Sequence, residues 1–310
     1  MKKVFIDGSA GTTGLRIHER LAGRADLEIL TLSEETRKDP AARKEMLNEA
    51  DIAFLCLPDD AAREAVAMIE NPNTVVLDTS TAHRTLPGWC YGFPELSEEK
   101  TEEVKNAKRI AVPGCHASGF IALVAPLIKA GALPKEALLT CHSVTGYSGG
   151  CKKMIADYEG EETAPLLKAP RQYALGQQHK HLKEMTAITG LKNSPIFCPI
   201  VSDFYSGMAV TVPLFASQLN EGFGFNEIKK IYQKQYQSGL VSFKESADEG
   251  GFFSAAGLSD RDRMEVSVCG NEERILLLAR YDNLGKGASG AALECMNLVL
   301  GVPAETGLEI

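Results

Sequence analysis

The chain has 310 residues, 44% of them hydrophobic and 24% charged, with a formal net charge of -8 at pH 7. This size and balance predict one large or two ordinary folded domains, whose core needs neither disulfides nor metal ions. The acidic balance and the lack of a Lys/Arg-rich run argue against nucleic acid and anionic membranes as partners. No apolar stretch approaches the ~20 residues that span a bilayer, and the first residues lack a signal-peptide pattern, so we expect a cytoplasmic protein.

Short apolar runs alternate with helical patterns in the first third of the chain. Helices are predicted at residues 15–21 and 60–69, and strands at 4–6, 27–30, 52–57, 74–78 and 109–112. Strands that alternate with helices predict a parallel sheet with helices on both faces, the doubly wound arrangement of Rossmann-type domains.

The pattern changes after about residue 135. Strands are predicted at 138–144 and 208–214, a hairpin at 266–279 and a small-residue helix at 288–300. Period-two alternation and hairpins are typical of antiparallel sheets. The sequence therefore predicts an α/β protein with two parts. A dinucleotide-binding domain spans residues 1–115 and is completed by a C-terminal helix at 287–310. An α+β catalytic domain spans residues 116–286 and contains a mixed, largely antiparallel sheet, whose exposed face suggests a homo-oligomer (dimer or tetramer).

A glycine-rich loop joins the first strand to the first helix. Its sequence, GSAGTTG at residues 8–14, places glycine at every third position. Glycine permits a tight turn and lets backbone N–H groups approach a pyrophosphate, which the positive end of the following helix also attracts. The alternative is an ordinary strand-to-helix loop. We predict dinucleotide binding by five residues of this loop, which are Gly8, Gly11, Thr12, Thr13 and Gly14.

The residues after the second strand bear on the choice of cofactor. NAD sites place a carboxylate there for the ribose 2′-OH. Here Ser33 can donate a hydrogen bond to a 2′-phosphate and Arg37 can neutralise it, whereas Glu34 and Glu35 disfavour that anion. We predict NADP(H) as the cofactor; the alternative is that 34–38 is a solvated loop that touches no ligand.

Cys115 is the strongest candidate nucleophile among eight scattered cysteines, none of which forms a Cys-x-x-Cys pair. It follows a strand and the pair Pro113-Gly114, and it begins an apolar helix. At a helix N-terminus the dipole and the free N–H groups stabilise a thiolate. The alternative is a thiol that only packs. The spacing of cysteines and histidines matches no zinc pattern, so we expect no metal.

Six segments in chain order carry a resemblance to a known family. They are DTSTAHR at 78–84, YGFPEL at 91–96, PGC at 113–115, TGYSGG at 145–150, HKHLKE at 179–184 and DNLGKGASG at 282–290. With these segments the chain resembles the N-acetyl-γ-glutamyl-phosphate reductases, a family of the aspartate-semialdehyde dehydrogenase superfamily. The chain is short, and it reads Cys115-His116-Ala117-Ser118 where the long members carry Cys-Tyr-Pro-Thr. Both features resemble the short subtype, so contacts around residues 116–118 are expected to differ from those of the long type.

The resemblance implies the chemistry of an acyl-phosphate reductase in arginine biosynthesis. Cys115 would displace phosphate from N-acetyl-γ-glutamyl phosphate to give a thioester, and hydride from NADPH would reduce that thioester to the semialdehyde. The resemblance alone places Ser80 and Asn283 near the nicotinamide. For the phosphate, Arg84 is the first candidate, because a guanidinium binds phosphate through two N–H groups.

Other groups of the site are predicted from residue type and spacing. The loop that contains Ser148 and Gly149 suits a close backbone approach to substrate, or is a plain turn. Further cations for the phosphate or the substrate carboxylate are Lys152, Lys153 and Arg171.

The acid/base is predicted to be a histidine of the HKHLKE segment. His179 is our first choice and His181 the alternative, with Glu184 placed to orient His181 from one helical turn away. His142 lies mid-strand and is expected to be a core residue.

Two other kinds of protein compete with this interpretation. One is a related enzyme, either aspartate-semialdehyde dehydrogenase or the carrier-linked reductase of lysine synthesis; the latter would need a basic groove that this acidic chain does not show. The other is a non-catalytic NADP-binding sensor. A sensor needs the glycine loop, but it needs neither Cys115 nor the histidine segment.

Overall fold

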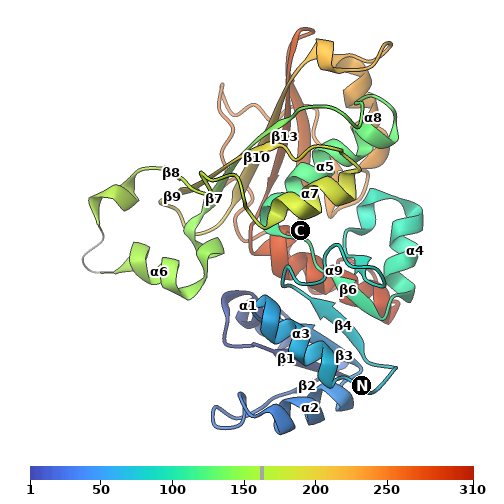
Figure 1. Cartoon of the computed structure of the whole chain (residues 1–310), viewed down its shortest axis with the longest axis vertical. Helices are drawn as coiled ribbons and strands as arrows, with labels where there is room; N and C mark the ends of the chain where they lie inside the picture. Colours follow the sequence, from blue (N-terminus) through green and yellow to red (C-terminus); the bar gives the residue numbers. More distant parts are fainter. Residues whose placement is uncertain (161–163) are drawn as a thin grey trace. The chain divides into compact units, whose positions relative to one another are not determined.

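The computed structural model describes residues 1–160 and 164–310. Contacts between residues divide the chain into two compact units, each with its own sheet (Figure 1). Unit 1 comprises Met1–Pro94, Glu99–Gly114 and Ala288–Leu308, and unit 2 comprises Glu95–Glu98, Cys115–Gly287 and Glu309–Ile310.

Unit 1 contains a six-stranded sheet in the order β2-β1-β3-β4-β6-β5, in which every pair of neighbours is parallel. The strands are β1 (Lys2–Asp7), β2 (Leu27–Leu30), β3 (Ile52–Leu55), β4 (Val75–Asp78), β5 (Cys90–Tyr91) and β6 (Arg109–Ala111). Strands β3 and β4 are buried along their whole length, as expected for apolar strands covered on both faces. The chain passes from β1 to β2 on one side and returns to β3 on the other, so the strand order reverses between β1 and β3.

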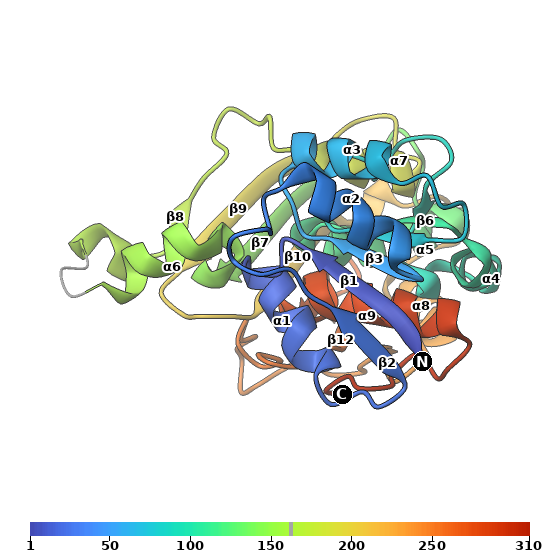
Figure 2. The ribbon, with the colours of Figure 1, turned by 90° about the horizontal axis from the view of Figure 1, so that it is seen from below.

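Helices cover both faces of this sheet (Figure 2). They are α1 (Thr12–Leu21), α2 (Pro40–Glu49), α3 (Asp59–Met68), α4 (Glu98–Asn106) and α9 (Gly290–Leu300). On one face, Ile17 of α1 and Met296 of α9 belong to the same core cluster as Val4 of β1. On the other face, Leu47 of α2 and Ala65 of α3 pack with Phe5 of β1 and its neighbours. The last helix is therefore part of the core of unit 1.

Unit 2 contains a seven-stranded mixed sheet in the order β11-β12-β13-β10-β7-β9-β8. The strands are β7 (Thr140–Gly146), β8 (Arg171–Gln172), β9 (Ile196–Ser202), β10 (Met208–Phe215), β11 (Val241–Phe243), β12 (Met264–Gly270) and β13 (Arg274–Tyr281). Only the pairs β11–β12 and β7–β9 are parallel, and the other four neighbouring pairs are antiparallel. A turn at residues 271–273 closes the β12–β13 hairpin.

The apolar helix α5 (Cys115–Lys129) packs against β10 and β13 and is the centre of unit 2. Next to it lie α7 (His181–Thr189) and α8 (Phe225–Gln235), and α8 also contacts β11 and β12. A short turn η2 (Tyr147–Gly150) and α6 (Cys151–Glu159) follow β7, and a short helix η3 (Pro165–Lys168) precedes β8. Tyr232 of α8 and Tyr236, the residue that follows this helix, donate hydrogen bonds to the carbonyls of Leu123 and Ala122, which fixes α8 along α5.

The predicted fold class is confirmed: a doubly wound parallel sheet precedes a mixed, largely antiparallel sheet. The helix predicted at 288–300 begins with a π-helical turn, η5 (Gly285–Ser289), before α9. The prediction that His142 is a core residue is wrong, because its side chain is exposed. Side chains alternate along a strand, and on β7 it is Cys141 and Ser143 that face the interior.

Candidate active site

Cys115 is the first residue of α5 and is half-buried. The strand β6 ends shortly before it, so the thiol lies where an apolar helix begins directly after a sheet strand. Cys90 and Cys141 have different surroundings, because both are buried. Burial raises the pKa of Cys90 to about 12 and raises that of Cys141 further, which keeps both thiols protonated at neutral pH. Compared with Cys90 and Cys141, the placement of Cys115 suits a nucleophile.

The first turn of α5 is held by Tyr281, a fully buried residue at the end of β13. Its hydroxyl donates to the carbonyl of Cys115 at 2.5 Å and accepts from the backbone N–H of Gly119 at 3.0 Å. A side chain is thus inserted between the two backbone groups that close a helical turn. Space here is limited: a Cβ at Gly119 would lie 2.7 Å from the Tyr281 hydroxyl, and one at Gly287 would lie 3.2 Å from Cβ of Cys115.

A cluster of aromatic rings surrounds the residue after the cysteine. His116 is 3% exposed, and its ring lies 5.4 Å from the ring of Phe197 and 5.8 Å from that of His179. Its Nδ1 lies 2.6 Å from Oγ of Ser143, and its Nε2 lies 2.6 Å from the hydroxyl of Tyr173. Burial, helped by the nearby His179, lowers the pKa of His116 to about 3. The ring is therefore neutral at physiological pH.

The two histidines of the HKHLKE segment lie beside this cluster but differ in their surroundings. His179 precedes α7, and its Nδ1 accepts the backbone N–H of His181 at 3.1 Å. An accepting Nδ1 leaves the proton of a neutral ring on Nε2. His181 begins α7 and is 5% exposed; its Nε2 lies 3.9 Å from Oε1 of Glu184, which is also buried. The geometry thus gives His179 a proton to donate and pairs His181 with a carboxylate.

The TGYSGG segment is a tight turn that Asn283 supports. A Cβ at Gly146 would lie 2.5 Å from the carbonyl oxygen of Tyr205, so only glycine fits at that position. Asn283 donates from Nδ2 to Oγ of Ser148 at 2.9 Å and accepts the N–H of Gly207 with Oδ1, also at 2.9 Å. These bonds connect the turn to the start of β10. Of the other candidates here, Gly149 lies in the turn and Lys152 is exposed on α6.

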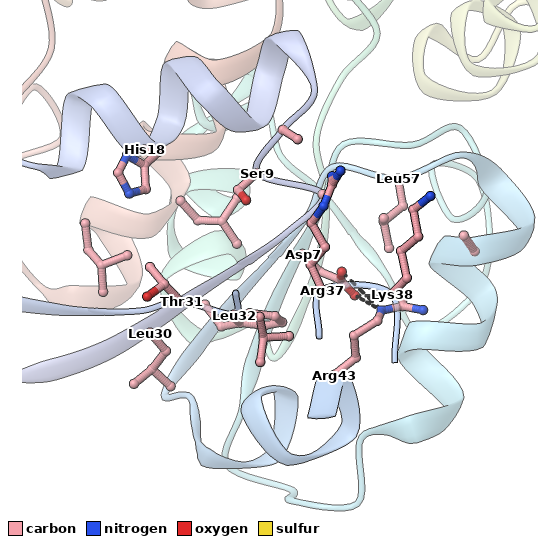
Figure 3. Close-up of a pocket in the computed structure, with 16 residues that line it drawn as sticks. Asp7, Ser9, His18, Leu30, Thr31, Leu32, Arg37, Lys38, Arg43 and Leu57 are labelled. Carbon is pink, nitrogen blue, oxygen red and sulfur yellow. Dashed lines mark hydrogen bonds and ion pairs between the residues drawn. The ribbon is translucent and has the colours of Figure 1, made fainter. Parts of the chain in front are cut away.

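Unit 1 has a pocket of about 360 Å³ at the switch point between β1 and β3 (Figure 3). Its walls come from the glycine loop, α1, the end of β2 and the segment before α2, and they include Asp7, Gly8, Ser9, Ala10, His18, Leu30, Thr31, Leu32, Arg37, Lys38, Arg43 and Leu57. Arg37, Lys38 and Arg43 lie on one side of the pocket and His18 and Leu30 on the opposite side. The carboxylate of Asp7 is paired with Arg43 at 2.8 Å, and Lys38 adds a further positive charge to the same wall.

The glycine loop has the geometry of a backbone cradle. Gly8 has a φ of +88°, and a Cβ there would lie 2.3 Å from the carbonyl oxygen of Cys56. A Cβ at Gly14 would lie 2.5 Å from the carbonyl oxygen of Gly8. Gly11 immediately precedes α1, which begins with Thr12 and Thr13. Of the loop, Gly8, Ser9 and Ala10 line the pocket, whereas Gly11, Thr12, Thr13 and Gly14 do not; the start of α1 follows directly, which is the arrangement of an anion-binding loop.

The two residues predicted to select the cofactor are placed differently. Arg37 lines the pocket, and its side chain also pairs with Glu34 at 2.9 Å. Ser33 does not line the pocket; its Oγ lies 3.0 Å from Oγ1 of Thr36. Thr31, which precedes Ser33 and was not predicted, does line it.

Ser80 and Arg84 are buried in a loop that follows β4 in unit 1. Ser80 donates to Oδ2 of Asp78 at 2.7 Å, and the same carboxylate oxygen lies 2.6 Å from Nδ1 of His83. Arg84 donates from Nε to the carbonyl of Val112 and from one terminal nitrogen to the carbonyl of Thr79, both at 2.9 Å. The guanidinium is therefore fixed between β4 and β6.

Comparison with known proteins agrees over the whole chain. A family model described as "Semialdehyde dehydrogenase, NAD binding domain" matches residues 3–104, and one described as "Semialdehyde dehydrogenase, dimerisation domain" matches residues 115–283. An N-acetyl-gamma-glutamyl-phosphate reductase of Trichormus variabilis is 43% identical over 318 residues, covering 99% of each chain. Another, of Chelativorans sp., is 46% identical over 310 residues, covering 96% of this chain and 98% of that one. The chain belongs to the N-acetyl-gamma-glutamyl-phosphate reductase family.

Solved structures of more distant proteins share the fold. An aspartate semialdehyde dehydrogenase II from Vibrio cholerae superposes with a TM-score of 0.70 at 17% identity, covering 97% of this chain and 99% of that one. This likeness establishes the α/β architecture alone. The glycine loop and the pocket lie within the residues matched by the NAD binding domain of the family, so unit 1 carries a nicotinamide-nucleotide site.

Two residues near Cys115, His116 and Tyr173, were not among the site residues predicted from the sequence. His116 was noted only as a departure from the long subtype, although its position directly after Cys115 was a signal that it lies at the site. Tyr173 lies in a segment without a motif, and only the fold brings it to His116. Within residues 1–160 and 164–310, no three His, Cys, Asp or Glu side chains gather as a metal site, and no helix is long and apolar enough to cross a membrane.

Proposed function

We propose that this protein reduces N-acetyl-γ-glutamyl phosphate with NADPH to N-acetyl-glutamate 5-semialdehyde and phosphate, a step of arginine biosynthesis in the cytoplasm. The observation that carries the proposal is the thiol of Cys115 at the start of α5, followed by His116, whose ring lies 5.8 Å from the ring of His179. Membership of the family supplies the substrate class.

Cys115 acts as the nucleophile in this proposal. Its thiolate, stabilised by the N-terminus of α5, attacks the acyl carbon, and the carbon–oxygen bond to phosphate breaks as the carbon–sulfur bond of a thioester forms. Phosphate leaves with the bonding electrons. The thioester is more easily reduced than a carboxylate, which is what the covalent step achieves.

His179 is proposed to transfer the proton to and from the substrate oxygen. When NADPH is bound, it supplies the hydride that reduces the thioester. The negative charge that then develops on the former carbonyl oxygen is neutralised by the proton on Nε2 of His179. The same nitrogen takes the hydroxyl proton back as the carbon–sulfur bond breaks and the aldehyde is released. His181, with Glu184, is proposed to support this geometry rather than to transfer the proton.

NADP(H) is the proposed cofactor, and the pocket of unit 1 is the proposed site of its adenosine end. Gly8, Gly11 and Gly14, with Thr12 and Thr13, fit a pyrophosphate, because a side chain at Gly8 or Gly14 would collide with backbone atoms. Arg37, with the neighbouring Lys38, is placed to bind a 2′-phosphate, and Ser33 is retained only as a neighbour of that site. Ser80 and Asn283 are proposed to lie at the nicotinamide end.

The anionic ends of the substrate need donors, and four residues are proposed to supply them. Arg84 is proposed for the phosphate, because its guanidinium is held in a fixed position by two carbonyls. Ser148 and Gly149 in the tight turn and Lys152 on α6 are proposed for the rest of the substrate.

Two proposals concern organisation. Residues 1–115 with 287–310 are proposed to bind the dinucleotide, and residues 116–286 to carry the chemistry and the subunit contacts. The two contact units and the two family models support this division. A homo-oligomer is supported by apolar side chains that unit 2 exposes, which include Phe215 at 62% and Ile196 at 61%.

The test is an assay in the reverse direction, in which NADP⁺ reduction is followed with phosphate and either N-acetyl-glutamate semialdehyde or aspartate semialdehyde. Turnover of the first aldehyde, with none or far less for the second, is the expected result. A preference for aspartate semialdehyde would reassign the enzyme to the related dehydrogenase. NADP binding without turnover of either aldehyde would favour a sensor.

A further inference from the structure

The side-chain amide of Asn283 has a different partner at each end. Its Oδ1 accepts the backbone N–H of Gly207 at 2.9 Å, and its Nδ2 lies 2.9 Å from Oγ of Ser148. A backbone N–H can only donate, so the end of the amide that faces Gly207 is the oxygen. The end that faces Ser148 is then the NH2 group, which also can only donate. The hydroxyl oxygen of Ser148 is therefore the acceptor in this bond.

The bond to Asn283 decides the direction of the Ser148 hydroxyl. Ser148 is 1% exposed, and across residues 1–160 and 164–310 its hydroxyl donates no hydrogen bond. Its backbone N–H donates to the carbonyl of Tyr205 at 3.0 Å, which fixes the position from which the side chain projects. Buried polar groups are normally hydrogen-bonded. A fixed, buried hydroxyl with a hydrogen still to donate suits a ligand that offers an oxygen.

Contacts on both sides of Asn283 in the chain place it near the nucleophile. Two residues before it, the hydroxyl of Tyr281 donates to the carbonyl of Cys115 at 2.5 Å. Four residues after it, a Cβ at Gly287 would lie 3.2 Å from Cβ of Cys115. Both ends of the segment 281–287 thus approach the first turn of α5. The amide of Asn283, with the hydroxyl that it bonds, therefore lies in the same part of unit 2 as the candidate thiol.

We propose that Asn283 is a positioning residue, which makes the hydroxyl of Ser148 a donor to an oxygen of the N-acetylglutamyl part of the substrate. The proposal rests on the proposed function, in which Ser148 binds this part of the substrate. Carboxylate and amide carbonyl oxygens accept hydrogen bonds, so a serine whose hydrogen is not bound within the protein can recognise them. Asn283 then lies at the nicotinamide end without being a ligand of the cofactor.

The test is Asn283→Asp in the full-length protein, assayed in the reverse direction, where the aldehyde, phosphate and NADP⁺ have separate KM values. Aspartate has the shape of asparagine, and one of its oxygens can still accept the N–H of Gly207. The other oxygen can only accept, so it takes the hydrogen of Ser148 and leaves none for the substrate. We expect KM for N-acetyl-glutamate semialdehyde to rise about 10-fold, and KM for NADP⁺ and for phosphate to stay within about threefold of the wild type.

Ser148→Ala and the double variant separate this effect from the added charge of the carboxylate. Ser148→Ala should raise KM for the aldehyde about as much as Asn283→Asp does. In the double variant no further rise is expected, because the hydroxyl that the carboxylate would capture is already absent. Losses that add would overturn the proposal, since the carboxylate would then act on the substrate directly. A rise in KM for NADP⁺ but not for the aldehyde would also overturn it, because Asn283 would then be a cofactor ligand.

Ser206→Ala is the matched control. The hydroxyl of Ser206 is buried and donates to Oδ2 of Asp282, the neighbour of Asn283, at 2.8 Å. The variant weakens the same region but leaves the bond between Asn283 and Ser148 intact, so KM for the aldehyde should stay within about threefold of the wild type. An equal rise in this control would reduce Asn283 to a structural role and overturn the proposal. Failure of the proposed function looks different: Cys115 of the wild type would resist alkylation by iodoacetamide, and N-acetyl-glutamate semialdehyde would not be turned over.

Discussion

Removing the hydroxyl of Tyr281 should damage the nucleophile more than it damages the fold. The hydroxyl bridges the carbonyl of Cys115 and the N–H of Gly119, and it is fully buried. In Tyr281→Phe both backbone groups lose this partner, and the first turn of α5 must close on itself or leave them unpaired. Each lost bond is worth about 1 kcal/mol, so we expect the free energy of unfolding to fall by about 2 kcal/mol.

The matched control is Tyr236→Phe. The Tyr236 hydroxyl is also buried and donates to a carbonyl of α5, that of Ala122 at 2.6 Å, but it lies two helical turns beyond Cys115. Its loss should lower the free energy of unfolding by about 1 kcal/mol and leave the thiol unaffected.

The two variants are compared by urea unfolding, by the rate of Cys115 alkylation and by kcat. In Tyr281→Phe we expect the sulfur to shift by a fraction of an ångström, which should lower kcat by about 10- to 100-fold and slow the alkylation of Cys115. In Tyr236→Phe we expect kcat and the alkylation rate to equal those of the wild type. If Tyr281→Phe merely unfolds more easily and its folded form alkylates and turns over like the wild type, the bridge has no part in placing the thiol.

Three further outcomes are expected. Cys115→Ser should abolish turnover and retain NADP binding, and more than a few per cent of residual activity would contradict the nucleophile assignment. Arg37→Ala should weaken NADP binding by about 10- to 100-fold and NAD binding far less. The control is Glu34→Gln, which removes the carboxylate paired with Arg37 and should not weaken NADP binding. If Arg37→Ala weakened the binding of both cofactors equally, the pocket assignment would be refuted. His116 has a folded-state pKa of about 3, below its ordinary 6.5, so unfolding takes up a proton between these values and stability falls as pH falls through this window. We expect urea unfolding at pH 7 and at pH 5 to show that the free energy of unfolding falls by about 2 kcal/mol more in the wild type than in His116→Gln. An equal fall in both proteins would show that the buried ring is not held neutral.

Much of the fold could be predicted from local pattern. The buried runs of β3 and β4 and the glycine turn after β1 each carry their own signal, because a parallel strand covered on both faces has few polar residues. The prediction that His142 is a core residue used only its position in the middle of a strand, and it is wrong. The face on which a strand residue lies depends on the register of the strand and on what covers each face of the sheet. The π-helical turn at Gly285–Ser289 also has no local signal, since it depends on the packing of Gly287 against Cys115.

The candidate site was predictable only where a residue type is tied to a local feature. Cys115 has such a feature, the start of a helix directly after a strand. Tyr173, Ser143 and Tyr281 have none, because each reaches the first turn of α5 from a distant part of the chain. The choice between His179 and His181 likewise depends on one backbone hydrogen bond at the start of α7, which no spacing rule contains.

The neutral state of His116 limits how Cys115 can be activated. In many cysteine enzymes a neighbouring imidazolium stabilises the thiolate, but a ring with a pKa of about 3 carries no such charge at neutral pH. The burial that prevents the charge also fixes the ring between Ser143 and Tyr173, where it acts as a neutral relay of hydrogen bonds. The N-terminus of α5, whose first turn Tyr281 bonds, is one source of stabilisation for the thiolate. The first turn of α5 thus supplies the thiol, the helix dipole that favours its anion, and the buried neutral ring that follows it in the chain.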